Sequence, residues 1–220
     1  MRLSIGIVGG SIAGCSAAIL LSRAGHDVSV FERSRGGLVG RGGGIATTGA
    51  MFEELVEWDV IDADMPHFKA EMMPFIVRTD DEPEFGRRPY AIPLDLRTFH
   101  WTELWGQLRR RVPDVTYHQG VAVTEARAVG DDSVELAFDS GEADRFDLVV
   151  FADGYHSMGR AHVSPDAQLR YRGYLLWRGL LGEAEIDDSP LGLDIPRLSY
   201  AGALGNATAY FVPSADGSAA

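Results

Sequence analysis

Residues 3–32 read LSIGIVGGSIAGCSAAILLSRAGHDVSVFE, and this stretch alternates between the sequence patterns of strands and of a helix. Leu3 to Val8 form a short apolar run rich in β-branched residues, which is typical of a buried strand, and residues 28–32 predict a second strand. Between them, residues 12–24 predict a helix that ends at Gly25, where a left-handed cap is common. Strand, glycine turn, helix and strand form a βαβ unit, whose strands pair in parallel through a right-handed crossover.

The turn after the first predicted strand carries a glycine-rich fingerprint. Its sequence is Gly9-Gly10-Ser11-Ile12-Ala13-Gly14, which follows the dinucleotide-binding pattern except that Ser11 replaces the middle glycine. Gly9 permits the tight turn, and Gly14 lets the helix lie close to the strand. A pyrophosphate is then expected at the helix N-terminus, where the helix dipole is positive and the Ser11 hydroxyl can donate a hydrogen bond.

An acidic residue stands where a ribose partner is expected. Glu32 ends the second strand 23 residues after Gly9, and its carboxylate is expected to accept a hydrogen bond from a ribose hydroxyl. The same negative charge argues against an adenosine 2′-phosphate at this place. The alternative is a glycine turn that serves only the close approach of helix and strand.

Composition narrows the class of protein. The chain has 220 residues, which suits one large domain or two small ones, and its formal net charge of −12 argues against nucleic-acid partners. Cys15 is the single cysteine, so an intrachain disulfide and a cysteine metal cluster are excluded, and the six histidines show no metal-ligand spacing. No apolar stretch reaches the length of a membrane span. We therefore expect a soluble, cytoplasmic protein with no metal site and no membrane partner.

The rest of the chain predicts further strands and helices around this unit. Helices are expected at residues 48–58 and 98–111, a glycine-rich loop at residues 35–44, and an exposed connection at residues 79–88. Strands are expected at residues 72–78, 115–118, 122–129, 133–138, 146–152, 169–181 and 208–213. The strands at residues 115–118, 122–129 and 133–138 are expected to form a meander.

A second motif follows the apolar run at residues 146–152. It reads Asp153-Gly154-Tyr155-His156-Ser157-Met158-Gly159-Arg160. At this point the chain resembles the single-component FAD-dependent aromatic monooxygenases, the para-hydroxybenzoate hydroxylase-like flavoproteins, and looks most like their 2,6-dihydroxypyridine hydroxylase-like branch. Other segments that carry the resemblance are Glu32-Arg33-Ser34, Arg41 within GRGGGI, Arg97 ahead of a helix, and Trp177-Arg178-Gly179.

The resemblance implies an α/β fold, in which a Rossmann-like FAD-binding βαβ domain is interleaved with a β-rich substrate domain. The FAD-binding domain is expected to comprise residues 1–70 and 97–168. The substrate-binding β domain is expected at residues 71–96 and 169–220 and is expected to be incomplete, because the family's later Gly-Asp flavin motif has no counterpart in this sequence.

The resemblance also assigns roles to residues at the cofactor. The FAD pyrophosphate would be cradled by the turn residues Gly9, Ser11, Ile12, Ala13 and Gly14. Glu32 would hold the adenosine ribose, and Arg33 would lie by the adenine. Arg41 and Arg97 would reach the phosphates or ribityl chain, and Asp153 with Gly154 would serve the flavin and the docking nicotinamide. Guanidinium groups suit phosphate because they stay charged and bind oxygens in pairs, although each arginine has the alternative of a solvated surface position. Asp153 is hypothesised to accept hydrogen bonds from backbone N–H groups or an arginine. One departure is Phe151, which stands where the family has a small residue and is expected to crowd the turn.

The activity implied by the resemblance is hydroxylation of a small aromatic or heteroaromatic molecule. NADPH or NADH reduces the flavin, the flavin reacts with dioxygen, and one oxygen atom passes to a ring carbon. No catalytic base is predicted, and the oligomeric state is left open, with a homodimer as one option. Two alternatives stay open: an NAD-dependent dehydrogenase with the same βαβ unit, and a truncated, non-catalytic flavin-binding remnant.

Overall fold

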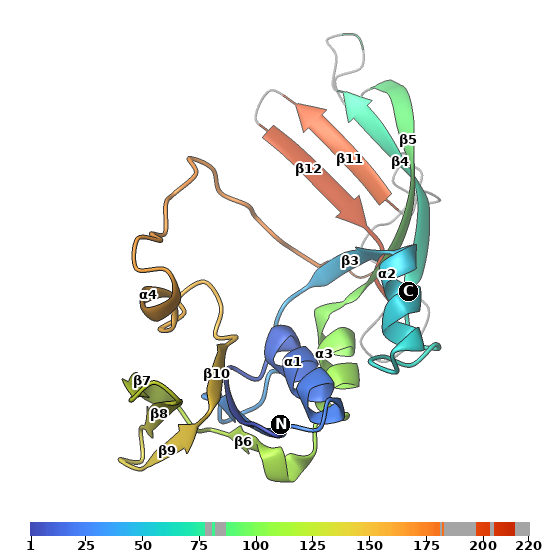
Figure 1. The fold of residues 1–220 in the computed structure, drawn as a ribbon. Coiled ribbons are helices and arrows are strands. Elements are labelled where there is room, and N and C mark those ends of the chain that lie inside the picture. Colours follow the sequence, from blue (N-terminus) through green and yellow to red (C-terminus); the bar gives the residue numbers. More distant parts are fainter. Residues whose placement is uncertain (78–80, 82–86, 181, 183–196, 203–204, 214–220) are drawn as a thin grey trace. The chain divides into compact units, whose positions relative to one another are not determined.

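The described residues divide into two compact units (Figure 1). The computed structural model describes residues 1–77, 81, 87–180, 182, 197–202 and 205–213. The first unit comprises Met1–Gly40 and Trp105–Leu176, and the second comprises Arg41–Leu104 and Trp177–Ala220. Residues 41–70 and 97–104, which the sequence grouped with the cofactor domain, thus cluster with the second unit. The assignment of one part to the cofactor and the other to the substrate stays a prediction.

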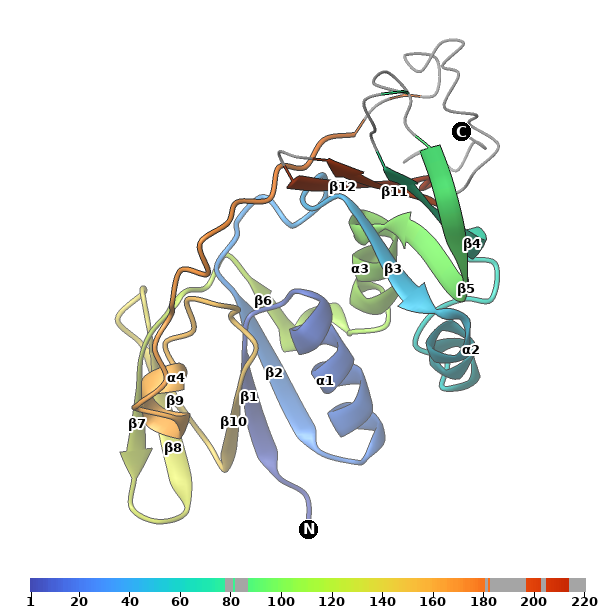
Figure 2. The ribbon, with the colours of Figure 1, turned by 90° about the horizontal axis from the view of Figure 1, so that it is seen from above.

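Four parallel strands form the central sheet of the first unit, in the order β10-β1-β2-β6. They are β1 (Ser4–Val8), β2 (Asp27–Glu32), β6 (Tyr117–Gln119) and β10 (Leu148–Phe151). Helix α1 (Ile12–Arg23) lies along β1 and β2 (Figure 2). It buries Cys15, Ala18 and Ile19, which share one face at helical spacing. The predicted βαβ unit and its parallel pairing are confirmed.

A three-stranded antiparallel meander packs beside this sheet. Its strands are β7 (Val123–Val129), β8 (Ser133–Phe138) and β9 (Ala143–Phe146), and β8 lies between the other two. The shared core is made of buried apolar side chains from the meander and from β1 and β2: Val8, Phe31, Ala126, Leu136, Phe138 and Phe146. Gly6 of β1 leaves room for two of these side chains, because a Cβ there would lie 2.9 Å from Phe146 and 3.1 Å from Leu136.

Three expectations for the first unit are wrong. The strand expected at residues 115–118 does not join the meander, since β6 follows the 3₁₀ turn η1 (Asp114–Thr116) and pairs in parallel with β2. The apolar run at residues 146–152 is two strands, because Asp147 separates β9 from β10 and exchanges hydrogen bonds with Ser4. Residues 169–180, the described part of another expected strand, contain none. Their apolar side chains are largely exposed, so apolar character alone did not indicate a sheet partner. The short helix α4 (Arg160–Val163) precedes this segment.

The second unit is built on a five-stranded mixed sheet, in the order β12-β11-β4-β5-β3. Its strands are β3 (Gly44–Thr48), β4 (Phe68–Val77), β5 (Arg87–His100), β11 (Arg197–Gly202) and β12 (Gly205–Tyr210). Helix α2 (Gly49–Glu57) confirms the predicted helix, and its N-cap residue Thr48 accepts a hydrogen bond from the Met51 N–H at 3.2 Å.

Helix α3 (Trp101–Arg109) crosses from the second unit into the first and begins later than the sequence predicts. Thr98 and Phe99 belong to β5, because Thr98 pairs with Ala46 of β3 and with Phe68 of β4. Strands β3 and β11 were not predicted, and β5 begins inside the segment expected to be a connection. The rest of that connection, residues 79–80 and 82–86, lies outside the described residues. The strand expected at residues 208–213 is β12, which begins and ends three residues earlier.

The close fit at Gly6 predicts opposite effects for two glycine substitutions. Gly6→Ala forces a methyl group against Phe146 and Leu136 and should lower the free energy of unfolding by about 1–3 kcal/mol. Gly106→Ala, in α3 with no atom within 4 Å of its added Cβ, should be neutral or stabilising by up to about 1 kcal/mol. Chemical unfolding of both variants checks this, and a destabilisation of equal size would contradict it.

Candidate functional site

The sheet order brings the two sequence motifs to the same edge of the first unit. After β1, the chain adds β2 and β6 on one side, whereas β10 joins on the other side of β1. In open α/β sheets, ligands bind outside the carboxyl ends of the strands at such a switch point. The glycine turn follows β1 and the Asp153-Gly154 motif follows β10, so both lie at this edge.

The backbones of the two motifs lie against each other. The Ala152 N–H donates to the Val8 carbonyl at 2.8 Å, which extends the β1–β10 ladder up to the turn. Gly9 has φ +102°, and a Cβ there would lie 2.6 Å from the Ala152 carbonyl oxygen. A Cβ at Gly14 would overlap the Gly9 carbonyl oxygen. Only glycine fits at both positions. Gly9 is required for its positive φ and for the close contact, and Gly14 is required for the close contact alone.

The helix start offers an anion site. Ser11 is the N-cap of α1, and its side chain makes no capping hydrogen bond. The first turn, Ile12, Ala13 and Gly14, contains no acidic side chain. The first N–H groups of a helix have no intrahelical acceptor, and the dipole is positive at this end. These features fit a phosphate group, as the sequence predicts.

Glu32 is buried, with 6% of its surface exposed, and its carboxylate ties two loops together. One oxygen accepts a hydrogen bond from the Gly10 N–H, and the other accepts from the Ser34 N–H, both at 2.8 Å. Each carboxylate oxygen has a second lone pair, so these bonds leave acceptor capacity for a sugar hydroxyl. The ribose role stays a prediction, and the structure adds a second role, which is to hold the glycine turn.

Asp153 presents an unsatisfied buried oxygen at this edge. Its Oδ2 accepts a hydrogen bond from the Met158 N–H at 2.9 Å, the kind of partner that was hypothesised. Its Oδ1 is buried and has no partner among the described residues. An orphaned buried acceptor is unfavourable unless a ligand or water donates to it. Asp153 Oδ1 is therefore free to accept a hydrogen bond from a ligand or a water molecule next to the glycine turn.

Phe151, the departure noted in the sequence, is accommodated by a glycine. A Cβ at Gly159 would overlap the Phe151 ring, so the ring occupies the space that a side chain at position 159 would need. Phe151 and Met158 both pack against the buried core of the first unit. The ring thus supports the turn from Asp153 to Gly159 and does not crowd it.

The predicted arginines lie in different places. Arg33 is exposed in the loop after β2. Arg41 and Arg97 belong to the second unit, where Arg41 is exposed and Arg97 is buried on β5 in an ion pair with Asp95. Gly154 is exposed with φ +85°. The cofactor contacts assigned to these four residues stay predictions.

Sequence reasoning missed three side chains that lie behind the turn. Trp105 of α3 and Tyr117 of β6 each donate a hydrogen bond to the Gly10 carbonyl oxygen at 3.0 Å, and the Cys15 thiol donates to it at 3.3 Å. No local pattern reveals these contacts, because Trp105 and Tyr117 are 95 and 107 residues from Gly10 along the chain.

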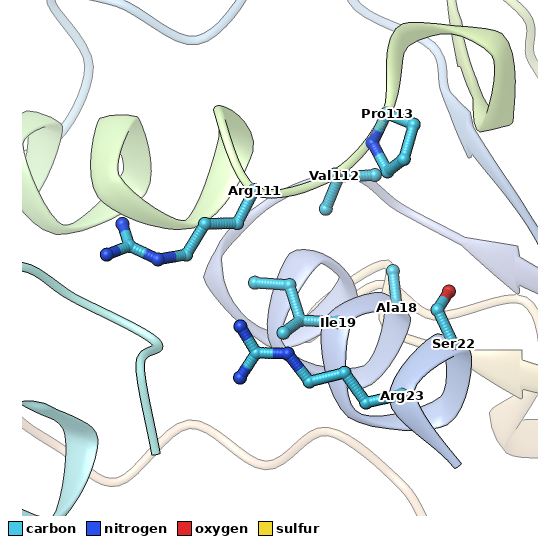
Figure 3. Close-up of a pocket in the computed structure, with 7 residues that line it drawn as sticks. All are labelled: Ala18, Ile19, Ser22, Arg23, Arg111, Val112 and Pro113. Carbon is cyan, nitrogen blue, oxygen red and sulfur yellow. The ribbon is translucent and has the colours of Figure 1, made fainter. Parts of the chain in front are cut away.

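A separate pocket of about 220 Å³ lies at the other end of α1 (Figure 3). It is lined by Ala18, Ile19, Ser22, Arg23, Arg111, Val112 and Pro113. Arg111 also donates to the backbone and side-chain oxygens of Gln107, at 3.0 and 3.1 Å. None of the residues predicted for the cofactor lines this pocket, so it is distinct from the site at the glycine turn.

The turn, the helix start and the acidic residue at the end of β2 have the arrangement of a Rossmann-like α/β fold. A family model described as an NAD(P)-binding Rossmann-like domain matches residues 7–55. The chain is 30% identical to a 2,6-dihydroxypyridine 3-monooxygenase from Paenarthrobacter nicotinovorans over 184 residues, which cover 84% of this chain and 44% of that protein. It is 30% identical to a 3-amino-4-hydroxybenzoate 2-monooxygenase from Streptomyces cremeus, over 90% of this chain and 50% of the relative.

A solved structure agrees with these relatives. The 2,6-dihydroxypyridine-3-hydroxylase of Arthrobacter nicotinovorans superposes with a TM-score of 0.83 and 27% identity, over 98% of this chain and 53% of that one. The predicted α/β fold class is confirmed, and so is the resemblance, since the relatives of this chain are FAD-dependent aromatic monooxygenases. The chain spans about half the length of the relatives that it matches.

The buried thiol behind the turn predicts a pH dependence. Burial raises the pKa of Cys15 from its ordinary value of 9.0 to about 12, while Arg109 lowers it and Glu32 raises it. Because the folded state then holds the proton more tightly than the unfolded state, this contribution to stability is complete below pH 9 and is lost as pH rises toward 12.

Cys15→Ala should therefore lose less stability than the wild type between about pH 8 and pH 11. Chemical unfolding across this range measures the difference. Groups that do not interact with Cys15 affect both proteins equally and cancel in the comparison. Cys15 contributes to the raised pKa of Tyr117, so the comparison is made in a Tyr117→Phe background. Identical slopes in the two proteins would contradict the assignment.

Proposed function

We propose that this chain binds FAD at the carboxyl ends of β1 and β10, and that it carries the cofactor part of an NAD(P)H-dependent monooxygenase. The proposal rests on one observation, which is that the glycine turn and the unsatisfied Oδ1 of Asp153 lie together at the switch point of the sheet. An anion site and an unsatisfied acceptor next to each other fit a molecule that has both a diphosphate and donor groups. FAD is such a molecule, and the relatives' names identify FAD-dependent or monooxygenase activities.

Residues of the first unit account for most of the proposed contacts. The N–H groups and the Ser11 hydroxyl at the start of α1 bind the diphosphate, with Gly9 and Gly14 keeping the space clear. Glu32 orients the turn and accepts a hydrogen bond from the ribose. Asp153 and Gly154 contact the flavin part of FAD and the docking nicotinamide. Arg33 by the adenine, and Arg41 and Arg97 at the phosphates or ribityl chain, complete the proposed set. When bound, the flavin supplies the exchange of electrons with NAD(P)H and dioxygen.

The proposed substrate is a small, electron-rich aromatic or heteroaromatic ring. The relatives are named for a dihydroxypyridine, a urate and an aminohydroxybenzoate, which are all rings with electron-donating substituents. The cytoplasm as location and a homodimer as assembly stay predictions. No helix among the described residues is long and apolar enough to cross a membrane.

Two rival functions are tested by one purification. A yellow protein whose released chromophore is FAD, and which oxidises NAD(P)H faster when a hydroxylated pyridine or benzoate is added, supports the proposal. A colourless protein that binds NADH but not FAD supports the dehydrogenase. FAD binding without any NAD(P)H oxidation supports the non-catalytic remnant.

A charge placed in the first turn of α1 tests the diphosphate site. Ala13 is exposed at the second helical position, and Ala13→Glu sets a carboxylate against the proposed diphosphate. We expect FAD affinity to fall at least about tenfold, although an acid at a helix N-terminus normally stabilises the helix.

Ala13→Gln is the matched control, because it adds the same bulk without the charge. FAD titration and thermal unfolding of both variants separate charge from size. If the two variants bind FAD equally well, the diphosphate does not lie at this helix start.

A further inference from the structure

One backbone carbonyl in the glycine turn receives three hydrogen bonds from buried side chains. The Gly10 oxygen accepts from the Trp105 indole and from the Tyr117 hydroxyl, each at 3.0 Å, and from the Cys15 thiol at 3.3 Å. The three donors come from α3, β6 and α1, and they are 8%, 6% and 0% exposed. A carbonyl oxygen has two lone pairs, so this acceptor is saturated.

The orientation of this carbonyl fixes the orientation of the next N–H group. All peptide bonds of the described chain are trans, so the Gly10 carbonyl and the Ser11 N–H lie in one peptide plane and point in opposite directions. Because the carbonyl points inward at Trp105 and Tyr117, the Ser11 N–H points away from them. It is the N–H at the N-cap of α1, where the proposed diphosphate binds.

The preceding peptide is held as well. The Gly10 N–H donates to the buried Glu32 carboxylate at 2.8 Å, so Gly10 is fixed through both its donor and its acceptor. A side chain at this position is excluded, since a Cβ on Gly10 would overlap the Tyr117 hydroxyl. Gly10 therefore has a defined task, although it is not one of the glycines that the fingerprint requires.

Tyr117 is itself held in place. The Arg109 guanidinium lies 3.9 Å from the centre of its ring, and Arg109 forms an ion pair with Asp114 at 2.7 Å. Burial, with Cys15 and Glu32 nearby, raises the pKa of the Tyr117 hydroxyl, so the group stays protonated and donates throughout the neutral range.

We propose that Tyr117 and Trp105 are positioning residues of the nucleotide site, which hold the Gly10–Ser11 peptide in the orientation that offers the Ser11 N–H to a diphosphate. They do not touch the ligand, and they act through the backbone of the turn. This inference rests on the proposed function for its ligand, whereas the hydrogen bonds on which it depends exist in the free protein.

Tyr117→Phe tests the inference, because it removes the hydroxyl and keeps the ring under Arg109. We expect the dissociation constant for FAD to rise about three- to tenfold, the effect of one buried hydrogen bond. Amide exchange of residues 10–14 in the free protein should also become faster, while exchange in β8 and β9 stays unchanged. Titration by flavin fluorescence and hydrogen exchange measure the two effects.

Ile5→Val is the control for general destabilisation. Ile5 is 1% exposed on β1, at the end away from the turn, and the loss of one buried methylene lowers the unfolding temperature without touching Gly10. Ile5→Val should leave FAD affinity within about twofold of the wild type. If it weakens FAD binding as much as Tyr117→Phe does at an equal loss of unfolding temperature, the role of Tyr117 is merely structural and the proposal is wrong.

A double variant adds a test of the shared acceptor. Trp105→Phe and Tyr117→Phe together leave only a thiol donor at the Gly10 carbonyl, so their combined effect on amide exchange at residues 10–14 should exceed the product of the single effects. Simple multiplication of the single effects would overturn the view that they act on one acceptor. If the wild type binds no FAD, the proposed function fails, and the exchange data then decide the positioning role alone.

Discussion

The close approach of two backbones at the end of β1 determines the geometry of the candidate site. At Gly9 the chain turns so near to β10 that even a methyl group would lie 2.6 Å from the Ala152 carbonyl. This approach places Asp153 beside the turn and sets the start of α1 at the switch point of the sheet. The two motifs thus lie together at one edge of the sheet, because residues 9 and 152 leave no space between them.

In the first unit, the features that a short stretch of sequence determines by itself could be predicted. The period of the apolar residues in residues 3–32 specifies strand, helix and strand, and the glycine turn predicts a dinucleotide ligand. The Asp153 motif was recognisable because it directly follows a buried apolar run. The ribose role of Glu32 stays a prediction, and its two bonds to backbone N–H groups follow only from the way the loops after β1 and β2 come together.

The errors arise where partners far apart in sequence decide the outcome. Residues 98–100 have helix-compatible side chains, yet pairing with β3 and β4 keeps them in β5. The short β6 was grouped with its sequence neighbours, whereas its hydrogen bonds go to β2. Trp105 and Tyr117 escaped notice for the same reason, since their acceptor lies about half the chain away.

The burial of Cys15 has a practical consequence for spectroscopy. It is the single cysteine of the chain, its side chain is inaccessible to solvent, and burial disfavours its reactive thiolate. The native protein therefore presents no competing thiol to maleimide dyes or nitroxide spin labels. A cysteine introduced at one exposed position in each unit would carry a label pair without removal of the native residue, and distances between the labels would report how the two units are arranged in solution.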